Sequence, residues 1–152
     1  MSFYATIQGC IKYRDKDAFD KARKLLVDGM WLNSEGMFVD ECGNVIDNGT
    51  MELHANPATL TITIPYFCHR NLSRTLDDLT AGTAGRVCWT STDGCFEGGY
   101  YTDGEHKWFN LTEWAKTEGE SEAEIPNQEN DFEAYCEWMF EIETDFHDNF
   151  GG

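Results

Sequence analysis

Residues 3–13, FYATIQGCIKY, alternate cleanly between apolar and polar side chains. In an extended chain every second residue points to the same side. One side then carries Phe3, Ala5, Ile7, Gly9, Ile11 and Tyr13, and the other carries Thr6, Gln8, Cys10 and Lys12. An apolar side that alternates with a polar side is typical of a strand with one face in the core. The stretch therefore predicts a half-buried β-strand.

A helix and a hairpin are predicted next. Asp15 is a good N-cap because its carboxylate can accept a hydrogen bond from a free backbone N–H, and Gly29 suits the helix end. Between them the apolar residues recur at helical spacing, at Ala18, Phe19, Ala22, Leu25 and Leu26. Residues 30–40 predict a hairpin that turns at 33–36, and the turn residues in 42–49 predict a loop.

A second strand and a second helix are predicted further along. Over residues 59–64, Thr alternates with apolar residues, which indicates another strand. Pro65 suits the first position of a helix because it has no N–H to satisfy. Near-helical spacing follows at Phe67, Leu72, Leu76 and Leu79. We therefore expect a helix that begins at Pro65.

Residues 86–110 predict a three-stranded antiparallel meander. Asp-Gly pairs at 93–94 and 103–104 separate segments rich in Val, Trp, Phe and Tyr. Asp-Gly between such segments is the strongest short-range signal for a hairpin. A short helical turn is expected at 111–116.

Acidic residues are concentrated at one end of the chain. The 28 acidic and 11 basic residues give a net charge of −17, which argues against nucleic acid or an anionic membrane as a direct partner. Residues 1–116 hold 16 acids and all 11 bases, whereas residues 117–152 hold 12 acids and no Lys or Arg. Six of the bases fall within residues 12–24. We expect one domain, with an α+β core over 1–116, an acidic linker over 117–130 and an acidic amphipathic helix over 131–152 packed on the core.

This C-terminal helix is predicted to have an apolar side and an acidic side. Its expected packed side holds Phe132, Tyr135, Cys136, Met139, Ile142 and Phe146. Its other side holds Glu133, Glu137, Glu141 and Asp145 at four-residue intervals, joined by Asp148. Each interval rises about 6 Å, and each like-charge pair costs the helix a few tenths of a kcal/mol.

Three interpretations of the acidic side remain open. It is a solvated face, or it pairs internally with the bases of residues 12–24, or it binds a basic surface of another protein. In the third case Glu118, Glu120, Glu122 and Glu124 of the linker would extend the surface.

The predicted order is strand, helix, hairpin, then strand, helix, meander, then the terminal helix. We therefore expect an α+β fold, an antiparallel sheet with helices packed on one face plus the acidic C-terminal helix. The two strand-helix-hairpin units are compatible with ferredoxin-like halves.

Composition and motifs exclude several classes of protein. An aromatic content of 14% excludes a disordered chain, and no run approaches the roughly 18 apolar residues of a membrane span. The first residues lack the basic and apolar regions of an export signal. We expect a soluble, cytoplasmic protein of a host cell, with its six cysteines reduced and mostly buried.

The sequence shows no catalytic or metal-binding motif. There is no Cys-x-x-Cys, and the four histidines are scattered at 54, 69, 106 and 147. Closed metal sites usually have paired ligand spacing, and no nucleophile lies in an evident pairing with a base. We expect a non-enzymatic protein without a metal or cofactor.

In overall character the chain resembles the small acidic proteins by which phages and plasmids disable host defences. These are the anti-CRISPR and antirestriction inhibitors, many of which mimic DNA. The resemblance rests on size, on the absence of catalytic motifs and on the acidic block from Glu118 to Asp148. It implies a monomer or homodimer that inhibits a host nuclease or a nucleic-acid-guided defence complex by binding its basic surface.

Two other classes remain open. A small enzyme would place a cleft near Cys68-His69 or between the meander and the linker. A structural or assembly module would form a homodimer through exposed aromatic residues, and its binding would persist at high salt.

Overall fold

The computed structural model describes residues 4–40, 42–46, 52–70, 73–91, 96–117 and 125–150. These residues form six strands and four helices. The strands are β1 (Tyr4–Lys12), β2 (Ala55–Asn56), β3 (Thr61–Arg70), β4 (Ala84–Ser91), β5 (Glu97–Thr102) and β6 (Glu105–Asn110). The helices are α1 (Lys16–Asp28), α2 (Ser73–Thr80), α3 (Leu111–Thr117) and α4 (Phe132–Phe150).

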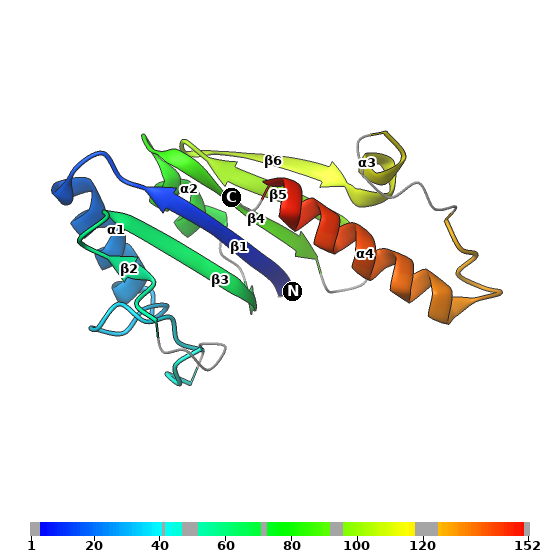
Figure 1. The fold of residues 1–152 in the computed structure, drawn as a ribbon, viewed down its shortest axis with the longest axis horizontal. Helices are drawn as coiled ribbons and strands as arrows, with labels where there is room; N and C mark the ends of the chain where they lie inside the picture. The colour runs from blue at the N-terminus through cyan, green and yellow to red at the C-terminus, as the bar shows by residue number, and fades with distance from the viewer. Residues whose placement is uncertain are drawn as a thin grey trace.

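The strands form one antiparallel sheet in the order β2-β3-β1-β4-β5-β6. Strands β1 and β2 both run antiparallel to β3, so they are parallel to each other, and α1 connects them. In the same way β3 and β4 flank β1 and are connected by α2 (Figure 1). Two such split βαβ units in the order β2-β3-β1-β4 have the ferredoxin-like topology. The predicted α+β class is confirmed, and β5 and β6 extend this unit at the β4 edge.

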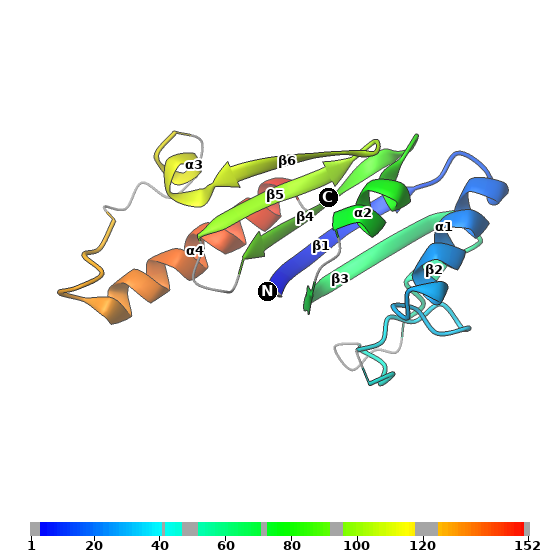
Figure 2. The same ribbon diagram turned by 180° about the vertical axis from the view of Figure 1, so that it is seen from behind.

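The two faces of the sheet are covered by different helices. Helices α1 and α2 cover one face, over a core that includes Ile7, Ile11 and Trp89 (Figure 2). Helix α4 lies on the other face, where Cys88 and Phe146 belong to a second core (Figure 1). Neighbouring residues of β4 therefore enter different cores, as the alternation of a strand requires. The acidic helix packs on the core as expected, on the face opposite α1 and α2.

The predicted ends of α1 and the predicted hairpin are confirmed. Asp15 accepts a hydrogen bond from the N–H of Ala18 at 2.8 Å, and Gly29 caps the last turn. After the helix, Leu32 and Phe38 form a β-bridge, which closes a short hairpin.

The helix predicted to begin at Pro65 is wrong, because β3 continues through this residue to Arg70. Ile7 pairs with Phe67 but Gly9 pairs with Ile64, so two residues of β3 face one residue of β1. Such a bulge needs no N–H from the extra residue, and for this reason it accepts a proline. Helix α2 begins at Ser73 instead.

The second Asp-Gly turn is confirmed by its backbone. Asp103 and Gly104 have φ values of 49° and 76°, the left-handed conformation that a two-residue hairpin turn of type I′ requires. The short helix after the meander is also confirmed, as α3. The first Asp-Gly pair, at 93–94, lies outside the described residues.

Gly9 should tolerate no side chain, because the backbone of β4 occupies the space beside it. A Cβ at Gly9 would overlap the carbonyl oxygen of Arg86 and lie 2.7 Å from Cα of Val87. We expect Gly9→Ala to lower the free energy of unfolding by at least the roughly 1–3 kcal/mol typical of overpacking. Urea unfolding measures this change. Gln8→Ala, one residue away and partly exposed, is the control and should cost much less. Equal stability of the two variants would contradict the prediction.

Candidate functional site

Helix α4 is fixed to the sheet by aromatic packing. Asp131 caps it, accepting a hydrogen bond from the N–H of Ala134 at 3.2 Å. Phe146 is fully buried and makes edge-to-face contacts with Trp114 at 5.2 Å and Phe109 at 5.5 Å between ring centroids. Phe150 stacks on Tyr100 at 5.4 Å. These contacts hold one side of α4 against β4, β5, β6 and α3, so its opposite side faces solvent.

The predicted packed side of α4 is correct for Tyr135, Met139, Ile142 and Phe146 and wrong for Phe132 and Cys136. Ile142 and Phe146 are buried as expected, whereas Phe132 and Cys136 are exposed. The reason is that the first turns of α4 project past the end of the sheet (Figures 1 and 2). A sequence pattern gives the side on which apolar residues lie, but not how far the surface beneath them extends.

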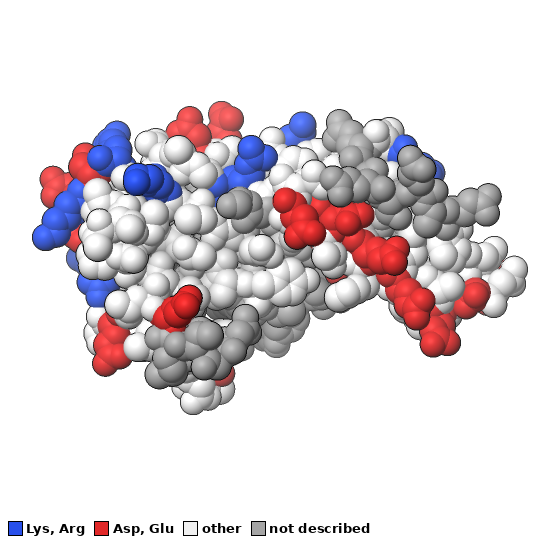
Figure 3. Space-filling view, viewed as in Figure 1, with Lys and Arg blue, Asp and Glu red and all other residues white. Residues whose placement is uncertain are grey.

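The predicted acidic side is a continuous line of carboxylates, which we call the carboxylate line. Glu133, Glu137, Glu141 and Asp148 are exposed, and Asp145 is half-buried. Figure 3 shows these residues as a diagonal red band over α4. Among the described residues, no Lys or Arg forms an ion pair with Glu133, Glu137 or Glu141. These three glutamates therefore present charge that no described Lys or Arg neutralises. The linker residues Glu118, Glu120, Glu122 and Glu124 lie outside the described residues.

Internal pairing between the carboxylate line and the bases of residues 12–24 is excluded by the fold. Most of these bases lie on α1, at the end of the molecule far from α4 and on the other face of the sheet (Figures 1 and 2). In Figure 3 they form a separate blue group. Of the three interpretations, a solvated face and a partner-binding face remain.

A buried Cys-His pair joins α4 to the centre of the sheet. His147 is 2% exposed, its Nδ1 lies 2.9 Å from Sγ of Cys88, and its Nε2 lies 2.9 Å from Oγ1 of Thr90. Burial lowers the pKa of His147 to about 4 and raises the pKa of the Cys88 thiol to about 12. Both groups are therefore neutral at pH 7, and Cys88 lacks the thiolate that a nucleophile needs. The pair fixes α4 on β4. No local pattern predicts this pair, because 59 residues separate the two partners.

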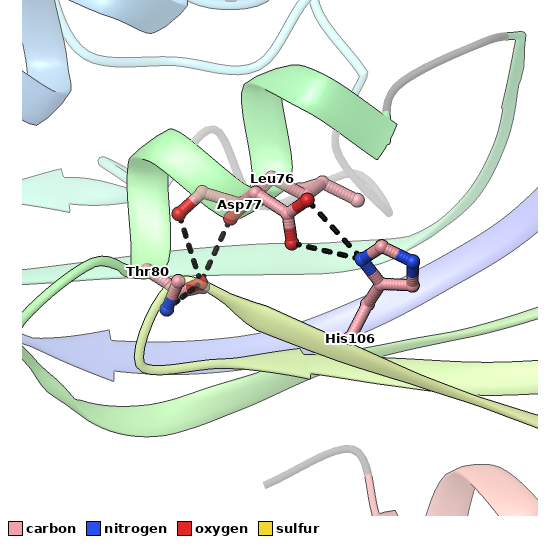
Figure 4. A network of polar contacts seen from close by, with 5 residues as sticks. Leu76, Asp77, Thr80 and His106 are labelled. Atoms are coloured by element: carbon pink, nitrogen blue, oxygen red, sulfur yellow. Dashed lines mark hydrogen bonds and ion pairs between the residues drawn. The ribbon is translucent and has the colours of Figure 1, made fainter.

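A hydrogen bond between Asp77 and His106 connects α2 to the edge strand β6 (Figure 4). His106 Nδ1 lies 3.2 Å from the Asp77 carboxylate. The neighbouring Thr80 hydroxyl donates to the Leu76 carbonyl at 2.9 Å and accepts from the N–H of Gly104 at 3.3 Å. Because this hydroxyl is buried and already hydrogen-bonded, it is not a free nucleophile. The Asp77–His106 and Thr80 contacts hold α2 against the β5–β6 turn.

The part of the chain that the structure describes holds two hollows, and the wider one, of about 520 Å³ and open to solvent, is bordered by Asp20, Arg23 and Lys24 of α1. A cavity of about 140 Å³ lies between α1 and α2, bordered by Arg14, Lys21 and Asp78, which is small beside the roughly 300 Å³ or more of typical ligand pockets. In the described ranges, no three His, Cys, Asp or Glu residues are grouped as metal ligands. No helix described here is long and apolar enough to cross a bilayer.

The structure describes the side chains of four cysteines, and none of these four forms a disulfide. Cys88 is buried and Cys10 half-buried, but Cys42 and Cys136 are exposed. The expectation of mostly buried cysteines is therefore wrong for these two. Cys68-His69, the place given to a hypothetical enzyme cleft, lies in β3, and its side chains are outside the described part of the structure.

Comparisons of the chain with protein-family models, with curated proteins and with solved structures find no match. Function must therefore be inferred from the residues and their arrangement.

Two titrations on α4 should oppose each other. The pKa of His147 is about 4 in the folded protein against about 6.5 unfolded, so the unfolded state takes up the proton first and stability falls as the pH drops through this window. Burial raises the pKa of Glu143 from 4.5 to about 7, so the folded state takes up that proton first and stability rises as the pH drops. The two effects offset each other between pH 7 and pH 5.

Single variants should separate these effects. We compare Glu143→Gln with Glu143→Gln/His147→Gln while the pH is lowered from 7.5 to 5. The free energy of unfolding of the single variant should fall by about 2 kcal/mol more than that of the double variant. The estimate follows because pH 5 lies about 1.5 units below the unfolded pKa of His147 and each unit is worth about 1.36 kcal/mol. In His147→Gln, stability should instead rise relative to the double variant. Urea unfolding at several pH values measures both slopes. Identical slopes in all three variants would show that neither group titrates as described.

Proposed function

We propose that this protein is a non-enzymatic inhibitor or interaction protein that binds a basic, nucleic-acid-binding surface of another protein through α4. The observation that carries the proposal is that Glu133, Glu137 and Glu141 of the carboxylate line are exposed and form no ion pair with a described Lys or Arg. Keeping like charges at four-residue intervals is unfavourable for an isolated helix. A cationic partner would convert this repulsion into attraction, and the net charge of −17 would steer the encounter.

The finer proposal is mimicry of nucleic-acid phosphates. Duplex DNA carries one charge per roughly 1.7 Å of its axis, whereas α4 carries one per roughly 6 Å along the carboxylate line. One helix is therefore sparser than DNA, and the linker acids Glu118, Glu120, Glu122 and Glu124 are proposed to add charge. The proposed target is a host nuclease or a nucleic-acid-guided defence complex, as for anti-CRISPR and antirestriction inhibitors of phages and plasmids.

A homodimeric structural module is the second candidate. The exposed Phe132 and Phe140 favour it, because an apolar patch left in solvent is a feature of subunit interfaces. The contact in such a dimer would be mainly apolar and would persist at high salt, whereas binding through the carboxylate line would weaken. The salt dependence of binding therefore distinguishes the two candidates.

Removing charge from the carboxylate line should leave the fold intact. Glu133→Gln/Glu137→Gln/Glu141→Gln keeps side-chain size and relieves repulsion, so we expect stability to be unchanged or to rise by up to about 1 kcal/mol. Thermal unfolding followed by circular dichroism measures it. The matched control is Glu35→Gln/Glu52→Gln/Glu105→Gln, which removes three exposed charges outside α4. A marked loss of stability confined to the α4 variant would show that these carboxylates make internal contacts.

Capture of a partner from nuclease-treated bacterial lysate tests the function. The wild-type protein and the control variant should retain a nucleic-acid-binding protein that is released between about 50 and 500 mM salt, because salt screens the contact. The α4 variant should bind it more than tenfold more weakly, since each charge-assisted hydrogen bond contributes about 1.5 kcal/mol or more. Added duplex DNA should displace the captured protein. Equal capture by the α4 variant, or indifference to salt and DNA, would refute the proposal.

A further inference from the structure

The first turns of α4 carry an exposed row of apolar residues, which we call the apolar stripe. Phe132 and Phe140 are 63% and 66% exposed, and Cys136 between them is also exposed. The three are four residues apart, so they lie along one side of the helix with a rise of about 6 Å per step. Burying a Phe side chain is worth about 1.5–3 kcal/mol. Two Phe residues left in water along one helix side are a feature of a surface that a partner covers.

The apolar stripe and the carboxylate line run side by side. Each residue of the stripe directly precedes a glutamate, in the pairs Phe132-Glu133, Cys136-Glu137 and Phe140-Glu141. Successive residues are turned by roughly 100° about the helix axis, so the two rows form neighbouring strips. The apolar stripe and Glu133, Glu137 and Glu141 of the carboxylate line are all exposed, so a partner can reach them.

The helix side next to the stripe also carries a half-buried carboxyl group, that of Glu143. Glu143 follows Phe140 by three residues and therefore lies on the same side of α4. Burial raises the pKa of its carboxyl group to about 7.

We propose that the apolar stripe and the carboxylate line together dock a cationic amphipathic helix of a partner protein. The inference rests on the proposed function and specifies it: the partner offers an apolar strip bordered by Lys or Arg, and not a bare phosphate-binding groove. Two helices side by side share one rise per residue, so lysines at four-residue intervals stay in step with Glu133, Glu137 and Glu141. An apolar helix face against an apolar helix side supplies the remaining contact.

A second copy of the chain fits the surface less well. Each copy carries a net charge of −17, so two copies repel each other. Two α4 helices packed through their apolar stripes would also bring their carboxylate lines close together. A cationic partner avoids both the repulsion between two acidic chains and the repulsion between two carboxylate lines.

Two synthetic peptides test the proposal. The first is a 20-residue Leu/Lys peptide with an amphipathic helical pattern, and the second replaces every Leu with Ser and keeps every Lys. Fluorescence anisotropy of the labelled peptides with the whole protein gives both affinities. Wild type should bind the Leu/Lys peptide at least tenfold more tightly than the Ser/Lys peptide. Phe132→Ser/Phe140→Ser should lose this preference and keep its affinity for the Ser/Lys peptide.

The control variant is Met30→Ser/Leu53→Ser, which removes two exposed apolar side chains outside α4. It should keep the preference of wild type. Equal affinity of wild type for the two peptides would overturn the docking proposal. The proposed function would still stand if binding of the Ser/Lys peptide depends on Glu133, Glu137 and Glu141. If the Gln variant at those positions binds the Ser/Lys peptide as wild type does, the proposed function itself fails.

Sedimentation velocity of the protein alone tests whether a second copy of the chain covers the apolar stripe. We expect the same sedimentation coefficient for wild type and for Phe132→Ser/Phe140→Ser at all concentrations. A wild-type dimer that the double variant loses would assign the stripe to a homodimer and overturn the proposal.

Discussion

The pairing of β1 with both β3 and β4 is the constraint on which the rest of the structure depends. Because β1 is antiparallel to both, β3 and β4 must run parallel to each other, and a parallel pair needs a crossover connection. Helix α2 is that crossover, and α1 plays the same part between β1 and β2. The apolar side of β1 lies under these two helices, so the opposite face of the sheet is left for α4.

The position of α4 then determines which of its side chains are exposed to solvent. Its aromatic side packs on β4, β5, β6 and α3, and the His147 contacts with Cys88 and Thr90 hold it at the centre of the sheet. The carboxylate line must consequently face outward. The apolar stripe lies on a different side of α4 from the buried Trp138 and Ile142, so it is exposed as well. Charge is also separated along the molecule, with the α1 bases at one end and the carboxylate line at the other (Figure 3), which orients an approaching charged partner.

Much of the fold could be predicted from local patterns. The alternation of apolar and polar residues predicted β1, Asp15 as N-cap predicted the start of α1, and the Asp103-Gly104 pair predicted the β5–β6 turn. Each prediction succeeded because it depends on residues close together in the chain. The helix predicted at Pro65 failed for a non-local reason. Proline is accepted inside β3 only because a bulge against β1 removes the need for its N–H, and the bulge depends on pairing with a strand more than 50 residues away.

The sequence by itself determined that the C-terminal segment is an amphipathic helix with carboxylates at four-residue intervals, since helical geometry fixes which residues share a side. Only the tertiary structure decided that these carboxylates are not neutralised by the bases of residues 12–24, because distance in space depends on which face of the sheet each helix covers. It also decided that Phe132 and Cys136 are exposed while His147 is buried. A periodic pattern specifies the direction of a side chain, but burial depends on whether another part of the chain lies in that direction.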